Sequence, residues 1–158
     1  MFVLLALTAC GGDPTIIDGS VNGESLGEVA TAFWGGPFIL FSNEDLDCMD
    51  VDFARRTYDQ TTAPTDFDMV TLQFAFDSSD ISEGVFSTEG SDAAVDAKTL
   101  IVAGGAFTEL RDRTGSIEVG PVVEREPVEG SFQVEFEDDS GSYTADYFIA
   151  EWCTNLVR

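Results

Sequence analysis

Residues 130–137 read Gly-Ser-Phe-Gln-Val-Glu-Phe-Glu, and this stretch decides the fold class. Phe132, Val134 and Phe136 alternate with polar residues. Because successive side chains of a β-strand point to opposite faces of a sheet, the alternation predicts a strand with one buried and one solvated face. The same period of two recurs in residues 68–77 and 143–149, which predicts two further strands.

Weaker strand patterns complete the expected sheet. They fit residues 15–21, 26–34, 37–42, 85–88, 98–103 and 115–119. Asn22-Gly23 is a tight hairpin signal, and residues 138–141 link the last two strands at hairpin length. Short strands with frequent turns predict an all-β, mainly antiparallel domain, built as a β-sandwich or a small barrel.

One short helix is expected around residues 43–53. Ser42 or Asn43 could cap its N-terminus, and acidic residues follow in the first turn. Apolar residues from Leu46 to Phe53 fall at helical spacing, a stripe more typical of a core than of a binding face.

The N-terminal residues 1–12 read MFVLLALTACGG. The apolar run is too short for a bilayer-spanning helix, which needs about 20 residues. Leu7-Thr8-Ala9-Cys10 resembles a bacterial lipobox, in which the cysteine is lipidated and begins the mature protein. The resemblance implies a signal peptide over residues 1–9, a lipidated Cys10 with a short tether over residues 10–14, and a single β-sandwich-like domain over residues 15–158. An ordinary secretory signal or a cloning remnant is the alternative.

The C-terminal residues carry a second resemblance. Gly141-Ser142-Tyr143 and Ala150-Glu151-Trp152-Cys153 are similar to the final strand of small lipid-anchored β-domain proteins of Gram-negative bacteria, most of which have no assigned activity. By resemblance to such lipoproteins, Gly11 lacks the aspartate that often retains them in the inner membrane. These resemblances imply an outer-membrane location and a β-fold, and they imply no chemistry.

The chain has three cysteines, Cys10, Cys48 and Cys153. An odd number in an exported protein leaves one thiol to explain. If Cys10 carries lipid, the other two are left to pair in an oxidising compartment. Their disulfide would close a loop of roughly 100 residues and would stabilise the domain by about 4–5 kcal/mol in the chain-entropy model. Two buried free thiols are the alternative.

Charge is the second strong signal. Thirty acidic residues stand against seven basic ones, which gives a formal net charge of −23. Such a field repels nucleic acid, so no nucleic-acid partner is expected. The chain is 44% hydrophobic, which predicts a folded core inside an acidic shell rather than disorder. The shell could be a surface adapted to high salt, a calcium-binding surface, or an attractant for a basic partner.

The densest acidic stretch offers Asp45, Asp47, Asp50 and Asp52 as candidate calcium ligands. The stretch begins like an EF-hand loop, but a cysteine stands at the glycine position and an alanine at the position of the closing glutamate. A looser oxygen-ligand site and a turn whose side chains bond to the local backbone both fit. No cofactor is expected, and calcium is the alternative.

Catalytic motifs are missing from the sequence. The chain has no histidine, so Ser-His-Asp and Cys-His arrangements are impossible. Paired carboxylates could still hydrolyse glycosides, but among thirty acids a workable pair has no specificity. Trp34, Trp152 and Tyr147 are candidates for stacking on sugar faces, and packing in the core is the alternative for each.

These features predict an outer-membrane-anchored lipoprotein with a non-enzymatic role in binding or envelope structure. The expected partner is an envelope protein or a glycan, in addition to the membrane that holds the lipid. A calcium-dependent carbohydrate- or protein-binding module is the first alternative. A carboxylate-based, glycosidase-like enzyme is the second.

Overall fold

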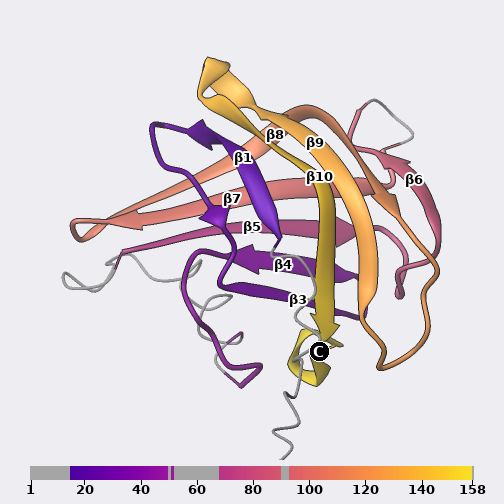
Figure 1. Ribbon diagram of the computed structural model, residues 1–158. Coiled ribbons are helices and arrows are strands. Elements are labelled where there is room, and N and C mark those ends of the chain that lie inside the picture. The colour runs from indigo at the N-terminus through magenta and orange to yellow at the C-terminus, as the bar shows by residue number, and fades with distance from the viewer. Residues whose placement is uncertain (1–14, 50, 52–67, 90–92, 158) are drawn as a thin grey trace, which may run out of the picture.

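The computed structural model describes residues 15–49, 51, 68–89 and 93–157, and these residues form an all-β fold (Figure 1). The strands are β1 Ile16–Val21, β2 Gly27–Glu28, β3 Thr31–Gly35, β4 Phe38–Ser42, β5 Met69–Phe76, β6 Gly84–Ser87, β7 Val95–Ala103, β8 Ala106–Val119, β9 Val128–Phe136 and β10 Gly141–Trp152. Two short 3-10 helices, η2 Glu137–Asp139 and η3 Thr154–Val157, flank β10.

The strands form two layers that cross each other (Figure 1). The front sheet holds β2, β1, β10, β9, the C-terminal half of β8, and β6. The back sheet holds β3, β4, β5, β7 and the N-terminal half of β8. Seven strands, β3, β4, β5, β7, β8, β9 and β10, pair in a closed ring. The protein is therefore a small β-barrel with extra strands at its edges, which confirms the predicted all-β class and is one of the two architectures that the sequence left open.

The long strand β8 forms one corner of the barrel. Its pairing with β7 ends at Lys98 and Arg111, and its pairing with β9 shifts register between Asp112 and Thr114. The Asp112 carboxylate accepts a hydrogen bond from the Ala97 N–H at 2.9 Å, so the backbone donor stays satisfied where β8 leaves β7.

On the side of the barrel away from the β8 corner, β10 and β3 close the ring. Two parallel pairs join them, Glu151 with Phe33 and Trp152 with Trp34. The two indole rings pack edge to face with their centroids 4.6 Å apart. A loop over residues 120–127 adds to this end, because the Trp34 indole N–H donates to the Glu126 carbonyl oxygen at 2.9 Å.

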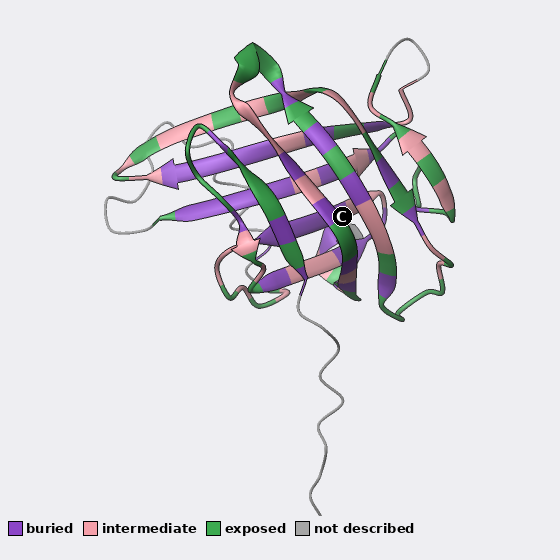
Figure 2. Cartoon of the chain, turned by 45° about the horizontal axis from the view of Figure 1, so that its top comes forward, coloured by how far each residue is buried: buried purple, intermediate pink, exposed green. Residues whose placement is uncertain are grey.

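Aromatic side chains fill the barrel between the two sheets. Figure 2 shows buried positions on the strands of both sheets. Phe41 from the back sheet packs against Phe132 and Phe148 from the front sheet, with centroid distances of 5.4 and 5.2 Å. Gly130 makes room for the Phe148 ring, since a Cβ at that position would lie 2.7 Å from it. Such rings contribute most of the buried apolar area of a small core.

The central strands of the back sheet, β4 and β5, are largely buried on both of their faces. Leu40, Val51, Cys153 and Leu156 form a second cluster on the outer face of this sheet. Met69, Leu100 and Val102 form a third, against which Leu46 packs. The front sheet by contrast has one buried and one exposed face, which is the pattern that its sequence predicts.

The predicted helix does not begin at residue 43. Residues 43–49 form turns and irregular backbone, Val51 is helical, and residues 50, 52 and 53 lie outside the described residues. Thr31 explains the difference. Its hydroxyl donates to the Glu44 carbonyl oxygen at 2.8 Å and accepts from the Leu46 N–H at 2.7 Å, so the backbone groups of a first helical turn are used by a strand instead.

Candidate functional site

The outer surface of the front sheet is a polar surface that several strands build together. Ser131, Gln133 and Glu135 point outward from β9, while Phe132 and Val134 fill the barrel. We call this surface the polar face, and it is defined by Ser116, Glu118, Ser131, Gln133, Thr144 and Asp146.

Strand register aligns the polar face in rows. One row crosses five of the six strands of the front sheet and consists of Asp18, Thr144, Gln133, Ser116 and Ser87. Another pairs Ser131 with Glu118, which in turn lies opposite the exposed Val85. The rows therefore combine small hydroxyl side chains with carboxylates, and residues distant in sequence share one surface.

The small side chains leave hollows on the polar face and at its borders. The hollow around Gln133 and Thr144 has a volume of about 310 Å³. Neighbouring hollows of about 360 and 270 Å³ continue it toward Glu89 and toward Tyr147. A further hollow of about 250 Å³ lies beside Arg113.

The residues that line these hollows are strongly acidic. Their carboxylates are Glu89, Glu118, Glu129, Glu135, Asp139 and Asp146. Arg113 is the one basic residue in the same lining. A ligand of the polar face would therefore meet many hydrogen-bond acceptors and an excess of negative charge.

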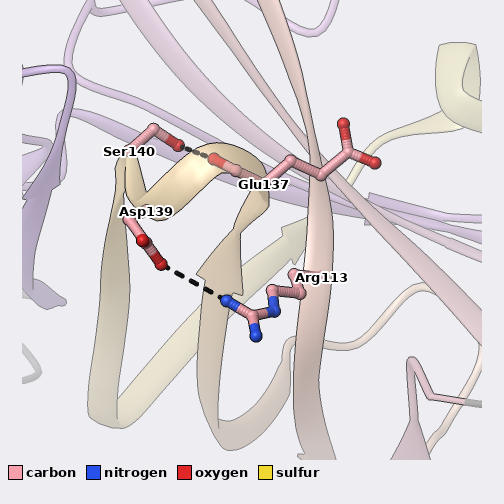
Figure 3. A network of polar contacts seen from close by, with 4 residues as sticks. All are labelled: Arg113, Glu137, Asp139 and Ser140. Carbon is pink, nitrogen blue, oxygen red and sulfur yellow. Dashed lines mark hydrogen bonds and ion pairs between the residues drawn. The ribbon is translucent and has the colours of Figure 1, made fainter.

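Arg113 is held at the border of the polar face (Figure 3). Its guanidinium lies 3.3 Å from the Asp139 carboxylate, and both side chains are well exposed. In the same hairpin, the Ser140 hydroxyl donates to the Glu137 carbonyl oxygen at 2.6 Å. These contacts order the β9–β10 hairpin, and an exposed ion pair of this kind contributes at most about 1 kcal/mol.

Two of the three aromatic candidates have core roles. Trp34 is 3% exposed, and its indole N–H donates to the Glu126 carbonyl oxygen. The hypothesis that it stacks on a ligand is therefore wrong. Trp152 is half-buried against Trp34 and the core cluster, and its indole nitrogen is buried. Tyr147 is exposed and lines the hollow that also contains Glu129 and Asp146.

The cysteine candidates separate into two groups. Cys48 and Cys153 form a disulfide with their Cα atoms 5.5 Å apart, as the cysteine count predicts. The bond ties the segment after β4 to the residue that follows β10, and the Asn155 side chain reinforces it by donating to the Cys48 carbonyl oxygen at 2.9 Å. Cys10, with the rest of the lipobox, lies outside the described residues.

The candidate calcium ligands do not converge on a site in the described part of the chain. Asp45 and Asp47 lie in the irregular segment after β4, and Asp50 and Asp52 lie outside the described residues. Among the residues that the structure describes, no group of three or more carboxylates or cysteines could hold a metal ion. At residues 78–80 the Ser78 hydroxyl donates to the Asp80 carbonyl oxygen at 2.6 Å, which is local turn bonding.

Tyr143 is the buried titratable group of the barrel. Burial raises the pKa of its phenol from 10.0 to about 12. The phenol donates to the Glu24 carbonyl oxygen at 3.0 Å, and its ring packs on Phe136. Tyr143 therefore joins the β1–β2 hairpin to β10 from inside the barrel and does not reach the polar face.

Sequence reasoning missed the polar face as a unit. The outward positions of β9 were visible as the solvated half of an alternating strand. Their alignment with Ser116 and Thr144 depends on strand register, which the sequence alone does not give.

Comparisons with known proteins give no information about this site. No family model matches the chain, and neither a curated protein nor a solved structure is significantly similar to it. Among the described residues there is no helix with the length and apolar character needed to cross a membrane.

Proposed function

We propose that this protein is a non-enzymatic binding module, held at the outer membrane by a lipid on Cys10, whose polar face binds a basic, extended segment of an envelope protein. The observation that carries the proposal is the contrast between the two sides of the front sheet. Its inner side is filled by aromatic rings, whereas its outer side carries the continuous hollows around Gln133 and Thr144.

Charge and shape favour a basic partner. The lining carries six carboxylates and one arginine, so Lys and Arg side chains would gain Coulomb energy and hydrogen bonds there. Ser116, Ser131 and Thr144 are short, which lets a chain approach the sheet closely. An extended segment suits a surface whose hollows continue along several strands.

The chemistry of the chain supports a binding role over catalysis. The chain supplies no histidine as a general base. The buried phenol of Tyr143 is engaged with a backbone carbonyl inside the barrel. Carboxylates on an open surface can bind cationic side chains without a general base or a nucleophile beside them.

The binding role is tested with a decalysine peptide and two charge-matched variants. Glu118→Lys/Asp146→Lys reverses two charges on the polar face. Asp96→Lys/Glu109→Lys reverses two exposed charges on β7 and β8 and leaves the polar face intact. We expect the first variant to weaken binding at least tenfold and the second less than twofold, measured by titration calorimetry at fixed salt. Equal losses in both variants would show that net charge alone attracts the peptide and would overturn the proposal.

The anchor is tested separately by metabolic labelling with radioactive palmitate. The wild-type chain should incorporate label and sediment with membranes. Cys10→Ser should lose both properties, whereas Cys153→Ser, which also removes one cysteine, should keep the label. Membrane retention of unlabelled Cys10→Ser protein would contradict the lipid anchor.

A further inference from the structure

The tether between the proposed lipid and the barrel is short. Four residues separate Cys10 from Thr15 in the sequence. At about 3.4 Å per residue, the five steps from Cys10 to Thr15 span at most roughly 17 Å. Thr15 must therefore stay close to any membrane that holds a lipid on Cys10.

Thr15 is fixed to the barrel near the C-terminal end of β10. Its hydroxyl accepts a hydrogen bond from the Ile149 N–H at 3.1 Å, and its carbonyl oxygen accepts one from the Val29 N–H at 3.0 Å. The side chain of Thr15 is buried, so this attachment is part of the fold. The end of β10 lies three residues beyond Ile149, at Trp152.

Exposed apolar side chains gather at this end of the barrel. Met49 is 80% exposed, and the Asn155 side chain lies 3.7 Å from its sulfur. Val123 is 51% exposed on the loop that Trp34 binds through Glu126. Ile16, next to Thr15, is 53% exposed. Figure 1 shows η3 and the β8–β9 loop at the same end of the molecule, with η2 at the opposite end.

We propose that this end of the barrel rests on the lipid surface, with Met49 and Val123 inserted among the headgroups. The inference rests on the proposed lipidation of Cys10 and adds an orientation to it. Apolar side chains gain free energy at the boundary between headgroups and acyl chains. The tether holds them there, so their individual affinity for the bilayer can be small.

Nearby carboxylates select the kind of lipid. Asp47, Glu124 and Glu126 border the exposed apolar side chains and are themselves exposed, and they outnumber Arg125, whose guanidinium lies 3.6 Å from the Glu124 carboxylate. They would be repelled by anionic headgroups and tolerated by zwitterionic ones. The contact should therefore form on phosphatidylethanolamine–phosphatidylcholine vesicles and weaken when phosphatidylglycerol is added.

Methionine oxidation tests the orientation directly. Chloramine-T is a charged oxidant that stays in water, and Met49 is a natural reporter of its access. The lipidated protein is placed in zwitterionic vesicles, and sulfoxide formation is followed by peptide mass spectrometry. Val123→Met adds a second reporter at the tethered end. Ser20→Met places a matched exposed reporter beside Ser142, near the start of β10.

We expect Met49 and the Val123→Met reporter to oxidise at least fivefold more slowly than in Cys10→Ser protein mixed with the same vesicles. The Ser20→Met reporter should change less than twofold. The orientation would be overturned if all three reporters slowed by the same factor relative to Cys10→Ser protein while mass spectrometry found lipid on Cys10. That result would leave the anchor standing. A Cys10 peptide without lipid would overturn the anchor and the orientation with it.

Discussion

Tyr143 shows how one polar atom is accommodated in an aromatic core. Its ring lies among Phe136 and the other core residues, while its hydroxyl reaches the Glu24 carbonyl oxygen. A buried phenol that donates to a backbone carbonyl is satisfied and stabilises the fold by about 1 kcal/mol. The same residue connects the first hairpin of the chain to its last strand.

The burial of Tyr143 makes the free energy of unfolding depend on pH in the alkaline range. The folded-state pKa of about 12 lies above the ordinary value of 10.0, so the folded protein holds the phenolic proton more tightly than the unfolded chain does. The contribution of Tyr143 is fully present below pH 10 and is lost as pH rises toward 12. Urea unfolding of wild type and Tyr143→Phe should therefore differ most at neutral pH and converge above pH 10. A gap that stays constant to pH 12 would contradict the burial of this phenol.

At the scale of elements, strands whose sequence alternates between apolar and polar residues were predictable, including β9 and the largely buried β5, and strands without that alternation were harder to predict. The alternation in residues 130–137 matches β9 and its burial pattern closely. The first half of β8 was missed, because its residues 106–114 are mostly polar, are exposed or half-buried, and show no apolar period. Burial of Met69 and Leu100 on the outer face of the back sheet was also hidden, since it depends on segments that pack over the sheet.

The segment after β4 shows why local helix signals failed. Residues 43–46 carry a capping residue and acidic side chains, which favour a helix start. Thr31 occupies the backbone groups of Glu44 and Leu46 from a neighbouring strand. A tertiary contact of this kind overrides local propensity and leaves no trace in the segment itself.

Thr31→Val tests that contact. The substitution keeps the shape of the side chain and removes both hydrogen bonds, which should lower the free energy of unfolding by about 1–3 kcal/mol. The Leu46 amide should also exchange with deuterium faster than in the wild type. Thr144→Val on the polar face is the control and should change stability by less than about 0.5 kcal/mol. Equal effects of the two substitutions would show that the Thr31 contact is unimportant.

At the scale of the whole molecule, the Cys48–Cys153 disulfide links residues 105 positions apart. It constrains the unfolded chain over most of the domain, which stabilises the fold by about 4–5 kcal/mol in the chain-entropy model. Cys48→Ala/Cys153→Ala should therefore unfold at a much lower urea concentration than the oxidised wild type. Wild type treated with dithiothreitol should resemble the double variant, and an unchanged midpoint in both would show that the bond adds nothing.

The acidic shell makes a second prediction for the whole molecule. With a formal net charge of −23, the folded state is strained by self-repulsion that any divalent cation screens. We expect about 5 mM calcium and 5 mM magnesium to raise the melting temperature equally. Calorimetry in the two salts, with EDTA as reference, measures this. A calcium-specific rise of several degrees would instead support the calcium-dependent binding module.

The closure of the ring through β10 has a consequence for biogenesis. Residues 141–152 pair with β1, β9 and β3, so the last strand joins both the first strand and the opposite wall of the barrel. A chain that emerges N-terminus first cannot close this ring until residues 141–152 are available. The long-range pairings of β10 therefore close the barrel only after the earlier strands are present.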